Sequence, residues 1–383
     1  MFLHAAETGI SSALEAENMT WIWQQPDWPA FRWDDAELSR PLAELRHEQG
    51  VLLGRFEALG FSLREHASLD TLTRDVTRTS EIEGERLDAA QVRSSVARRL
   101  GVDIGALTPA SRHVEGVVEM TLDATRNHAE PLTKDRLFGW HAALFPSGRS
   151  GMQRIRVGEW RDDARGPMQV VSGPIGRERV HYQAPPAARL DAEMDAFLEW
   201  FNRPPTTDLV LSAALAHLWF VTIHLFEDGN GRIARAVADL LLTRSEGSPQ
   251  RFYSMSAQIQ VERSAYYDAL RHAQTGGLDI SHWLAWFFAC LHRAILAART
   301  SLADILGKAD FWARHADTPL NPRQIKLLNL LLDGSLDVLT SSKWAKLAKC
   351  SQDTASRDIA GLLELGILRK GPAGGRSTHY QLV

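Results

Sequence analysis

One string of residues carries most of the groups that could do chemistry: His224-Leu-Phe-Glu-Asp-Gly-Asn-Gly-Arg-Ile-Ala-Arg235. The short run Gly229–Gly231 can adopt backbone conformations that direct successive N–H groups at one point. A helix expected to begin near Arg232 adds the positive end of its dipole. Arg232 and Arg235 are three residues apart and therefore lie on one face of that helix. The string thus predicts a cradle for the anionic groups of a polyphosphate.

Two further side chains in the string indicate what the cradle is for. Asp228 lies at its rim, where a carboxylate would repel phosphate unless a cation such as Mg²⁺ stood between them. His224 lies four residues earlier, at the end of an apolar stretch, and suits a proton acceptor at neutral pH. Taken singly, the glycines would indicate a turn and His224 a structural residue. The joint pattern of base, carboxylate and cradle favours attack of a hydroxyl on phosphorus.

The string resembles the Fic signature, His-x-Phe-x-Asp/Glu-Gly-Asn-Gly-Arg-x-x-Arg, at every fixed position, with Leu225 where the family usually has proline. The resemblance implies transfer of AMP from ATP–Mg²⁺ to a Ser, Thr or Tyr hydroxyl of a protein. It assigns His224 as the base and Asp228 as the metal ligand. It also implies that ATP contacts the rest of the string, which comprises Phe226, Glu227, Gly229, Asn230, Gly231, Arg232, Ile233, Ala234 and Arg235. Phe226, between two polar positions, is expected to pin the loop to the core.

Two other segments look like parts of the same family. Glu262–Leu270 resembles the stretch that closes over the base, so Tyr266 or Tyr267 is expected at the adenine pocket, with burial in the core as the alternative. Two β-type runs around a Gly-containing turn predict a hairpin within Met168–Pro186. This hairpin resembles the family's flap, which aligns a target segment by strand-type contacts.

A second motif precedes the signature in the chain. Thr79-Ser-Glu-Ile-Glu-Gly84 matches the inhibitory pattern Ser/Thr-x-x-x-Glu-Gly/Asn of Fic proteins. By this resemblance Glu83 would form an ion pair with Arg235 and occupy the place that the γ-phosphate needs. The same chain would then carry its own inhibitor. Taken alone, Glu83 would be a surface acid at a helix end.

Periodicity predicts a mainly α-helical protein with several parts. Residues 1–18 are expected to be a loose tail without the features of a secretory signal. An aromatic stretch at 21–33 opens an N-terminal helical region, 19–110, and is expected to pack one domain against another. The Fic catalytic core would span 111–306, a linker 307–319 and a winged-helix domain 320–383. Helices are expected at 35–59, 62–79, 88–100, 108–128, 134–145, 187–202, 207–223, 232–245, 263–274, 280–306, 323–332, 342–347 and 352–365.

Composition narrows the class of protein. The chain has 383 residues, a net charge of −4 and 44% hydrophobic residues, which suits several globular domains rather than a chain that coats nucleic acid or membrane. No run of about eighteen apolar residues occurs, so no membrane association is expected. The two cysteines, Cys290 and Cys350, lie far apart and fit a reducing, cytoplasmic location.

Several functional alternatives remain open at this point. Fic relatives that transfer other groups or remove AMP use the same residues, and the protein substrate could be the chain itself. Residues 319–383 carry nine Lys/Arg and five Asp/Glu, a net +4, whereas the remainder carries −8. This asymmetry is compatible with DNA binding by the winged helix and with a nucleotide-sensing regulator. A homodimer is also left open.

Overall fold

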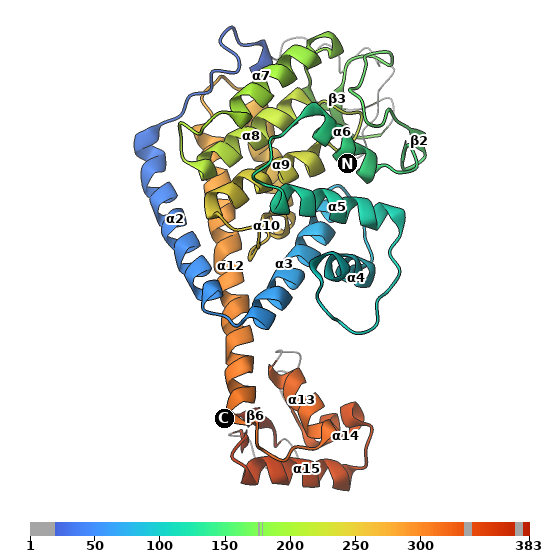
Figure 1. Cartoon of the computed structure of the whole chain (residues 1–383), viewed down its shortest axis with the longest axis vertical. Coiled ribbons are helices and arrows are strands. Elements are labelled where there is room, and N and C mark those ends of the chain that lie inside the picture. The colour runs from blue at the N-terminus through green and yellow to red at the C-terminus, as the bar shows by residue number, and fades with distance from the viewer. Residues whose placement is uncertain (1–19, 175–176, 178, 333–338, 372–377) are drawn as a thin grey trace. The chain divides into compact units, whose positions relative to one another are not determined.

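The computed structural model describes residues 20–174, 177, 179–332, 339–371 and 378–383. The expected tail at 1–18, part of the flap turn and Arg376 therefore lie outside the described residues. The chain divides into two compact units, Met1–Ala298 and Arg299–Val383 (Figure 1). Within the described ranges, no helix has the length and apolar character needed to cross a membrane.

The first unit is a helical assembly around two central helices. α8 (Leu209–Ile223) is apolar on every face and nearly completely buried, and it packs extensively against α9 (Asn230–Glu246) (Figure 1). The surrounding helices are α2 (Asp35–Glu57), α3 (Phe61–Ile82), α4 (Ala89–Leu100), α5 (Arg112–Arg126), α6 (Lys134–Leu144), α7 (Leu190–Asn202), α10 (Met255–Val261) and α11 (Arg263–Thr275). Two 3-10 turns, η1 (Ile22–Gln24) and η2 (Ala187–Arg189), complete the set. The mainly helical class predicted from sequence is confirmed.

Short polar residues begin many of these helices, as the sequence predicts. Asp88, the N-cap of α4, accepts a hydrogen bond from the Gln91 N–H. Ser111 and Thr133 cap α5 and α6 in the same way. α10 was not predicted, because its seven residues are too few to show a helical period.

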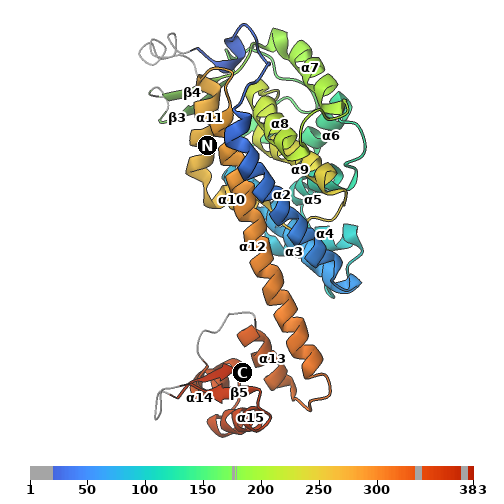
Figure 2. The same cartoon turned by 90° about the vertical axis from the view of Figure 1, so that its left-hand side faces the viewer.

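Two hairpins adjoin the helices. β3 (Gln169–Ser172) and β4 (Arg179–Gln183) form the expected antiparallel hairpin, which lies beside α11 (Figure 2). Trp21 and Trp23 pack against its base at Tyr182 and Ala184, so the aromatic stretch packs the region expected at 19–110 against the region expected at 111–306, and both lie in one compact unit. A second hairpin, β1 (Arg149–Ser150) with β2 (Gln153–Arg154), was not predicted because its strands have only two residues each.

The second unit contains the elements that the sequence predicted for it. These are α13 (Pro322–Leu332), α14 (Ser341–Ala348), α15 (Gln352–Glu364), β5 (Leu368–Lys370) and β6 (Tyr380–Leu382), packed around buried residues that include Trp344 and Ile359. This element order is that of a winged helix, which stays a prediction.

One predicted boundary is wrong. α12 (Ser281–Arg314) continues eight residues past the expected end at Leu306 and through Gly307. A single glycine costs a helix interior only about 1 kcal/mol. Burial of Phe311 in the core of the second unit outweighs that cost.

Candidate active site

The first signature residue ends α8 in an unusual conformation. His224 adopts the left-handed conformation, with φ 54° and ψ 61°, which a residue with a side chain rarely does. The buried guanidinium of Arg161 stabilises this turn by donating from Nε to the His224 carbonyl oxygen at 2.7 Å. The Arg161 backbone N–H also donates to the Leu225 carbonyl oxygen at 3.0 Å. Backbone strain of this kind is typical of functional sites.

The His224 side chain is poised to accept a proton. Its Nδ1 lies 3.2 Å from the Val221 carbonyl oxygen, so Nδ1 carries the hydrogen and Nε2 the lone pair. Nε2 is buried without a hydrogen-bond partner among the described residues. Burial, and then the positive charge of Arg161, lowers the pKa of His224 to about 4, so the ring is neutral at physiological pH.

The start of α9 presents backbone donors. Gly229, with φ 86°, caps the helix, and the first intrahelical bond runs from Ile233 N–H to Gly229 O at 3.0 Å. The preceding N–H groups therefore have no acceptor within the helix. The side chain of Asn230 does not join them, because it donates to the Phe226 carbonyl oxygen at 2.7 Å and accepts the Phe226 N–H at 3.0 Å. Asn230 thus closes the loop, and the backbone supplies the anion cradle.

Asp228 lies at the rim of this cradle, as predicted. Its Oδ1 accepts the Gly229 N–H at 2.6 Å, and its Oδ2 accepts a hydrogen bond from Ser150. Among the described residues, no cluster of three or more His, Cys, Asp or Glu could enclose a metal ion. A partly exposed carboxylate beside a phosphate cradle fits Mg²⁺, which binds through one or two carboxylates together with phosphates and water.

Glu83 forms the ion pair expected from its motif. Its Oε1 lies 2.9 Å from Arg235 Nη2, while Thr79 accepts from Arg235 through its hydroxyl at 2.8 Å and its carbonyl at 2.9 Å. Burial opposes the charge of Arg235, but Glu83 together with Tyr266 and Tyr267 more than offsets this and raises the arginine pKa. A Cβ at Gly231 would come within 2.3 Å of Glu83 Oε1. The carboxylate therefore lies directly against the backbone of the cradle.

The other signature arginine is also paired with an acid. Arg232, 1% exposed, donates from Nη1 to Glu85 Oε2 at 2.6 Å. His113 contacts the same carboxylate at 3.1 Å, and this contact raises the pKa of His113. Gly84, with φ 87°, lets the chain turn between the two glutamates, Glu83 and Glu85. Glu85 could not be found from the sequence, because the inhibitory pattern ends before it.

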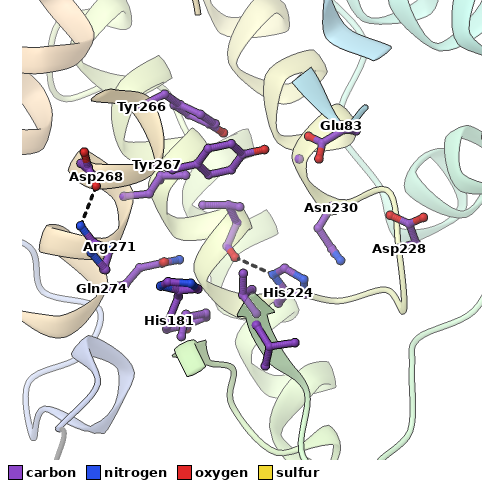
Figure 3. A pocket seen from close by; sticks show the side chains of 16 residues that line it. Glu83, His181, His224, Asp228, Asn230, Tyr266, Tyr267, Asp268, Arg271 and Gln274 are labelled. Atoms are coloured by element: carbon purple, nitrogen blue, oxygen red, sulfur yellow. Dashed lines mark hydrogen bonds and ion pairs between the residues drawn. The ribbon is translucent and has the colours of Figure 1, made fainter. Parts of the chain in front are cut away.

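A cavity of about 220 Å³ brings these groups together (Figure 3). Its lining includes Glu83, His224, Asp228, Asn230, Gly231, Tyr266 and Tyr267 from the predicted set. The β3–β4 hairpin and α11 supply most of the remainder, among them Val170, Val171, His181, Arg271 and Gln274. Base, rim carboxylate and helix N-terminus thus open on one space, as transfer to a hydroxyl would require.

Comparison with known proteins identifies the central part of the chain. The model of the Fic/DOC family matches residues 131–242, which include the whole signature. Protein adenylyltransferase Fic of Nematostella vectensis is 34% identical over 119 residues, covering 30% of this chain and 26% of that protein. Protein adenylyltransferase Fic of Drosophila willistoni is 26% identical over 267 residues, covering 67% of this chain and 47% of that protein. Residues 131–242 of the chain therefore form a Fic domain.

Other comparisons extend beyond the signature. A domain of unknown function, DUF4172, matches residues 21–102 of this chain, the region that carries Glu83. A Fic family protein from Desulfovibrio desulfuricans G20 has a similar fold, with a TM-score of 0.50 and 18% identity, covering 90% of this chain and 96% of that one. The chain spans only about a quarter to a half of the two adenylyltransferases named above.

Some predicted nucleotide contacts of the Fic domain lie in the core instead. Ile233 and Ala234 are fully buried and do not line the cavity, because they face the interior from α9. Phe226 is the expected anchor: it is fully buried and stacks on His141, with ring centroids 4.0 Å apart. Glu227 accepts the Arg156 N–H at 3.1 Å and borders a second, smaller cavity.

Both tyrosines border the main cavity and Tyr266 is also buried, while contact with adenine stays a prediction. Tyr266 is 1% exposed and bonded through its hydroxyl to His217 at 2.9 Å, yet it still borders the cavity. Tyr267 is less buried and directs its hydroxyl toward Glu83 (Figure 3). Burial, and then the charge of Glu83, raises the pKa of Tyr267 to about 12, so it stays a neutral donor. Gln274, also on the cavity wall, was missed because a lone glutamine in a helix has no sequence signature.

Proposed function

We propose that the chain is an autoinhibited protein adenylyltransferase, which moves AMP from ATP–Mg²⁺ to a Ser, Thr or Tyr hydroxyl of a protein. One observation carries the proposal: Glu83 lies against Gly231 and Arg235 at the start of α9, in the same cavity as the unpartnered Nε2 of His224. A carboxylate there occupies an anion site that faces a base. Fic relatives named protein adenylyltransferase support the choice of AMP as the group transferred.

In this reaction His224 would take the proton of the target hydroxyl. The hydroxyl oxygen would form a bond to the α-phosphorus, the bond from that phosphorus to the bridging oxygen would break, and pyrophosphate would leave. A neutral imidazole is the form that accepts a proton, and the lowered pKa of His224 keeps it in that form. Arg161 would keep the ring aligned through its bond to the His224 carbonyl oxygen.

The chain's own groups would bind the phosphates. The unpaired N–H groups at the start of α9 and the guanidinium of Arg235 surround the position that Glu83 Oε1 now fills. Asp228 would hold Mg²⁺, which supplies neutralising charge for the phosphates when bound. The β3–β4 hairpin, whose Val170 and Val171 border the cavity, would align a strand of the target.

Inhibition would follow from occupancy of the same space. While Glu83 is paired with Arg235, the terminal phosphate of ATP has neither the arginine nor the room beside Gly231. ATP could then bind only in a pose in which the α-phosphorus is misaligned for attack, and small misalignments are costly.

The test is incubation of wild type and a Glu83→Gly variant with Mg²⁺ and ATP labelled separately in the α and γ positions, followed by mass spectrometry. The proposal requires α-label on protein, stronger in the variant, with a mass increase of one AMP. Label from the γ position alone would show phosphate transfer instead. Loss of AMP from a pre-modified protein would favour a de-AMPylase, in which Glu83 positions water.

A second proposal concerns the C-terminal unit, which we infer binds DNA. Gln352, Ser356 and Arg357 are exposed on α15, while Ile359 and Leu362 on its other side are buried. Arg369 and Lys370 on β5 are exposed and could meet phosphates. A salt titration of the full chain on duplex DNA tests this, because binding through phosphates must weaken steeply with salt. No binding at low salt would favour a protein-docking module.

A further inference from the structure

Residues 150–158, which precede the flap, are attached to the signature loop at three points. Ser150 donates to Asp228 Oδ2, and the Arg156 N–H donates to Glu227 at 3.1 Å. His141 accepts the Gly158 N–H through Nδ1 at 3.2 Å, so its Nε2 donates to the Asp228 carbonyl oxygen at 3.2 Å. Residues 150–158 thus hold the two acidic residues of the signature.

This segment contributes little packing that would explain its presence. The tip of the β1–β2 hairpin exposes Met152 by 93%, and its strands pair through only two residues each. Gly148 and Gly151, with φ 70° and 55°, permit the tight turns that bring Ser150 back toward the loop. Hydrogen bonds to the signature loop, rather than apolar burial, therefore attach the hairpin.

The bonds to Asp228 fix the direction of its carboxylate. Oδ1 has a donor in the Gly229 N–H and Oδ2 has one in Ser150, so the carboxylate plane cannot rotate without losing a bond. A competing partner is close: Arg232 Nη2 lies 3.9 Å from Oδ1. Without Ser150, the carboxylate would be free to turn toward that guanidinium and shorten this long ion pair into a direct contact.

We propose that Ser150 is a positioning residue, which keeps the Asp228 carboxylate directed toward a divalent cation instead of toward Arg232. The inference rests on the proposed metal-binding role of Asp228 and adds a residue outside the signature to it. Ser150 lines the smaller cavity that Asp228 also borders, so it acts from the side away from His224, which lines only the main cavity.

The experiment compares Ser150→Ala, Ser150→Thr and the matched control Ser147→Ala, an exposed serine three residues earlier. The measurement is the Mg²⁺ dependence of ATP binding by calorimetry, with melting temperature as a check on the fold. Loss of a group that orients a metal ligand typically weakens metal affinity about tenfold or more. We therefore expect Ser150→Ala to need about tenfold more Mg²⁺, whereas Ser150→Thr and Ser147→Ala should match wild type. ATP binding without metal should be equal in all four proteins.

Three outcomes would overturn the inference. Equal Mg²⁺ dependence of Ser150→Ala and Ser147→Ala would show that the hydroxyl does not orient the carboxylate. Equal losses in Ser150→Ala and Ser150→Thr, with lower melting temperatures, would show a role in folding alone. Unchanged Mg²⁺ dependence in an Asp228→Ala variant would refute the proposed metal site itself, a failure that can be told apart from the first two.

Discussion

Removal of the Glu83 carboxylate is the sharpest test of how the cradle is occupied. Breaking a buried ion pair by deleting one partner costs about 3–5 kcal/mol. Here the Glu83 side chain is 24% exposed and Thr79 keeps two hydrogen bonds to Arg235, so we expect a smaller loss. A loss of about 2–3 kcal/mol corresponds to a melting temperature roughly 4–8 °C lower in a unit of this size.

An anion that binds the vacated site should restore the lost stability. In Glu83→Ala the unpaired Arg235 and the α9 N-terminus would bind tripolyphosphate or ATP, and the melting temperature should return toward that of wild type. Wild type should respond much less, because its own carboxylate fills the site. Differential scanning calorimetry with and without tripolyphosphate measures both effects.

The control is Glu81→Ala, two residues earlier on the same helix. Glu81 pairs with Arg78 on the surface, and such pairs contribute less than about 1 kcal/mol. The melting temperature of Glu81→Ala should lie no more than about 2 °C below that of wild type. Its response to tripolyphosphate should be no larger than that of wild type. If Glu83→Ala melts like Glu81→Ala, or fails to gain from tripolyphosphate, the carboxylate does not occupy an anion site.

Three further predictions follow from the same geometry. His224→Ala should reduce protein labelling by roughly 10²–10⁴-fold while ATP affinity by calorimetry stays within about twofold, and labelling at the wild-type rate would exclude His224 as the base. Glu85→Gln in the Glu83→Ala background should strengthen tripolyphosphate binding severalfold, because Arg232 is then no longer neutralised; unchanged or weaker binding would show that Glu85 does not mask Arg232. Burial lowers the pKa of His141, His217 and His224 to about 4, 3 and 4, below the unfolded value near 6.5. At these three sites the unfolded state therefore binds more protons below pH 6.5, and each histidine should lower stability by about 1 kcal/mol between pH 7 and 5.5. The raised pKa values of His113 and Asp239 act in the opposite direction, so the test compares urea titrations of wild type and His217→Gln at the two pH values; an equal change with pH in both would contradict a neutral buried His217.

The central helices and the signature could be predicted because the residues that determine them lie close together in the sequence. α8 is a continuous apolar run with Asp208 as its cap, and its end is marked by the residues of the signature. Asp88 and Gly101 bracket α4 within one residue of the expected bounds, since a capping carboxylate and a left-handed glycine act on neighbouring backbone. The ion pair of Glu83 with Arg235 was expected from a motif, not from any property of the intervening sequence.

The residues that were missed act over long separations. Arg161 supports His224 from 63 positions away, Ser150 reaches Asp228 from 78, and Glu85 reaches Arg232 from 147. Each is an ordinary polar residue in a loop or at a helix end, and only the fold brings it to the site. The extension of α12 was missed for a related reason, since the burial of Phe311 that supports it is decided by tertiary packing.

Glu85 adds a second ion pair that must break before both signature arginines are free. Arg235 and Arg232 are held by carboxylates of one short turn, so the turn can free both charges only by moving as a unit away from α9. If the two pairs together favour the closed state by about 3 kcal/mol, the open state is populated below about 1%. A ligand that binds both states equally cannot change that ratio, however tightly it binds. Under the proposed function, ATP alone would therefore release the site only as far as its phosphates replace both carboxylates, and any additional signal must bind the open turn in preference to the closed one.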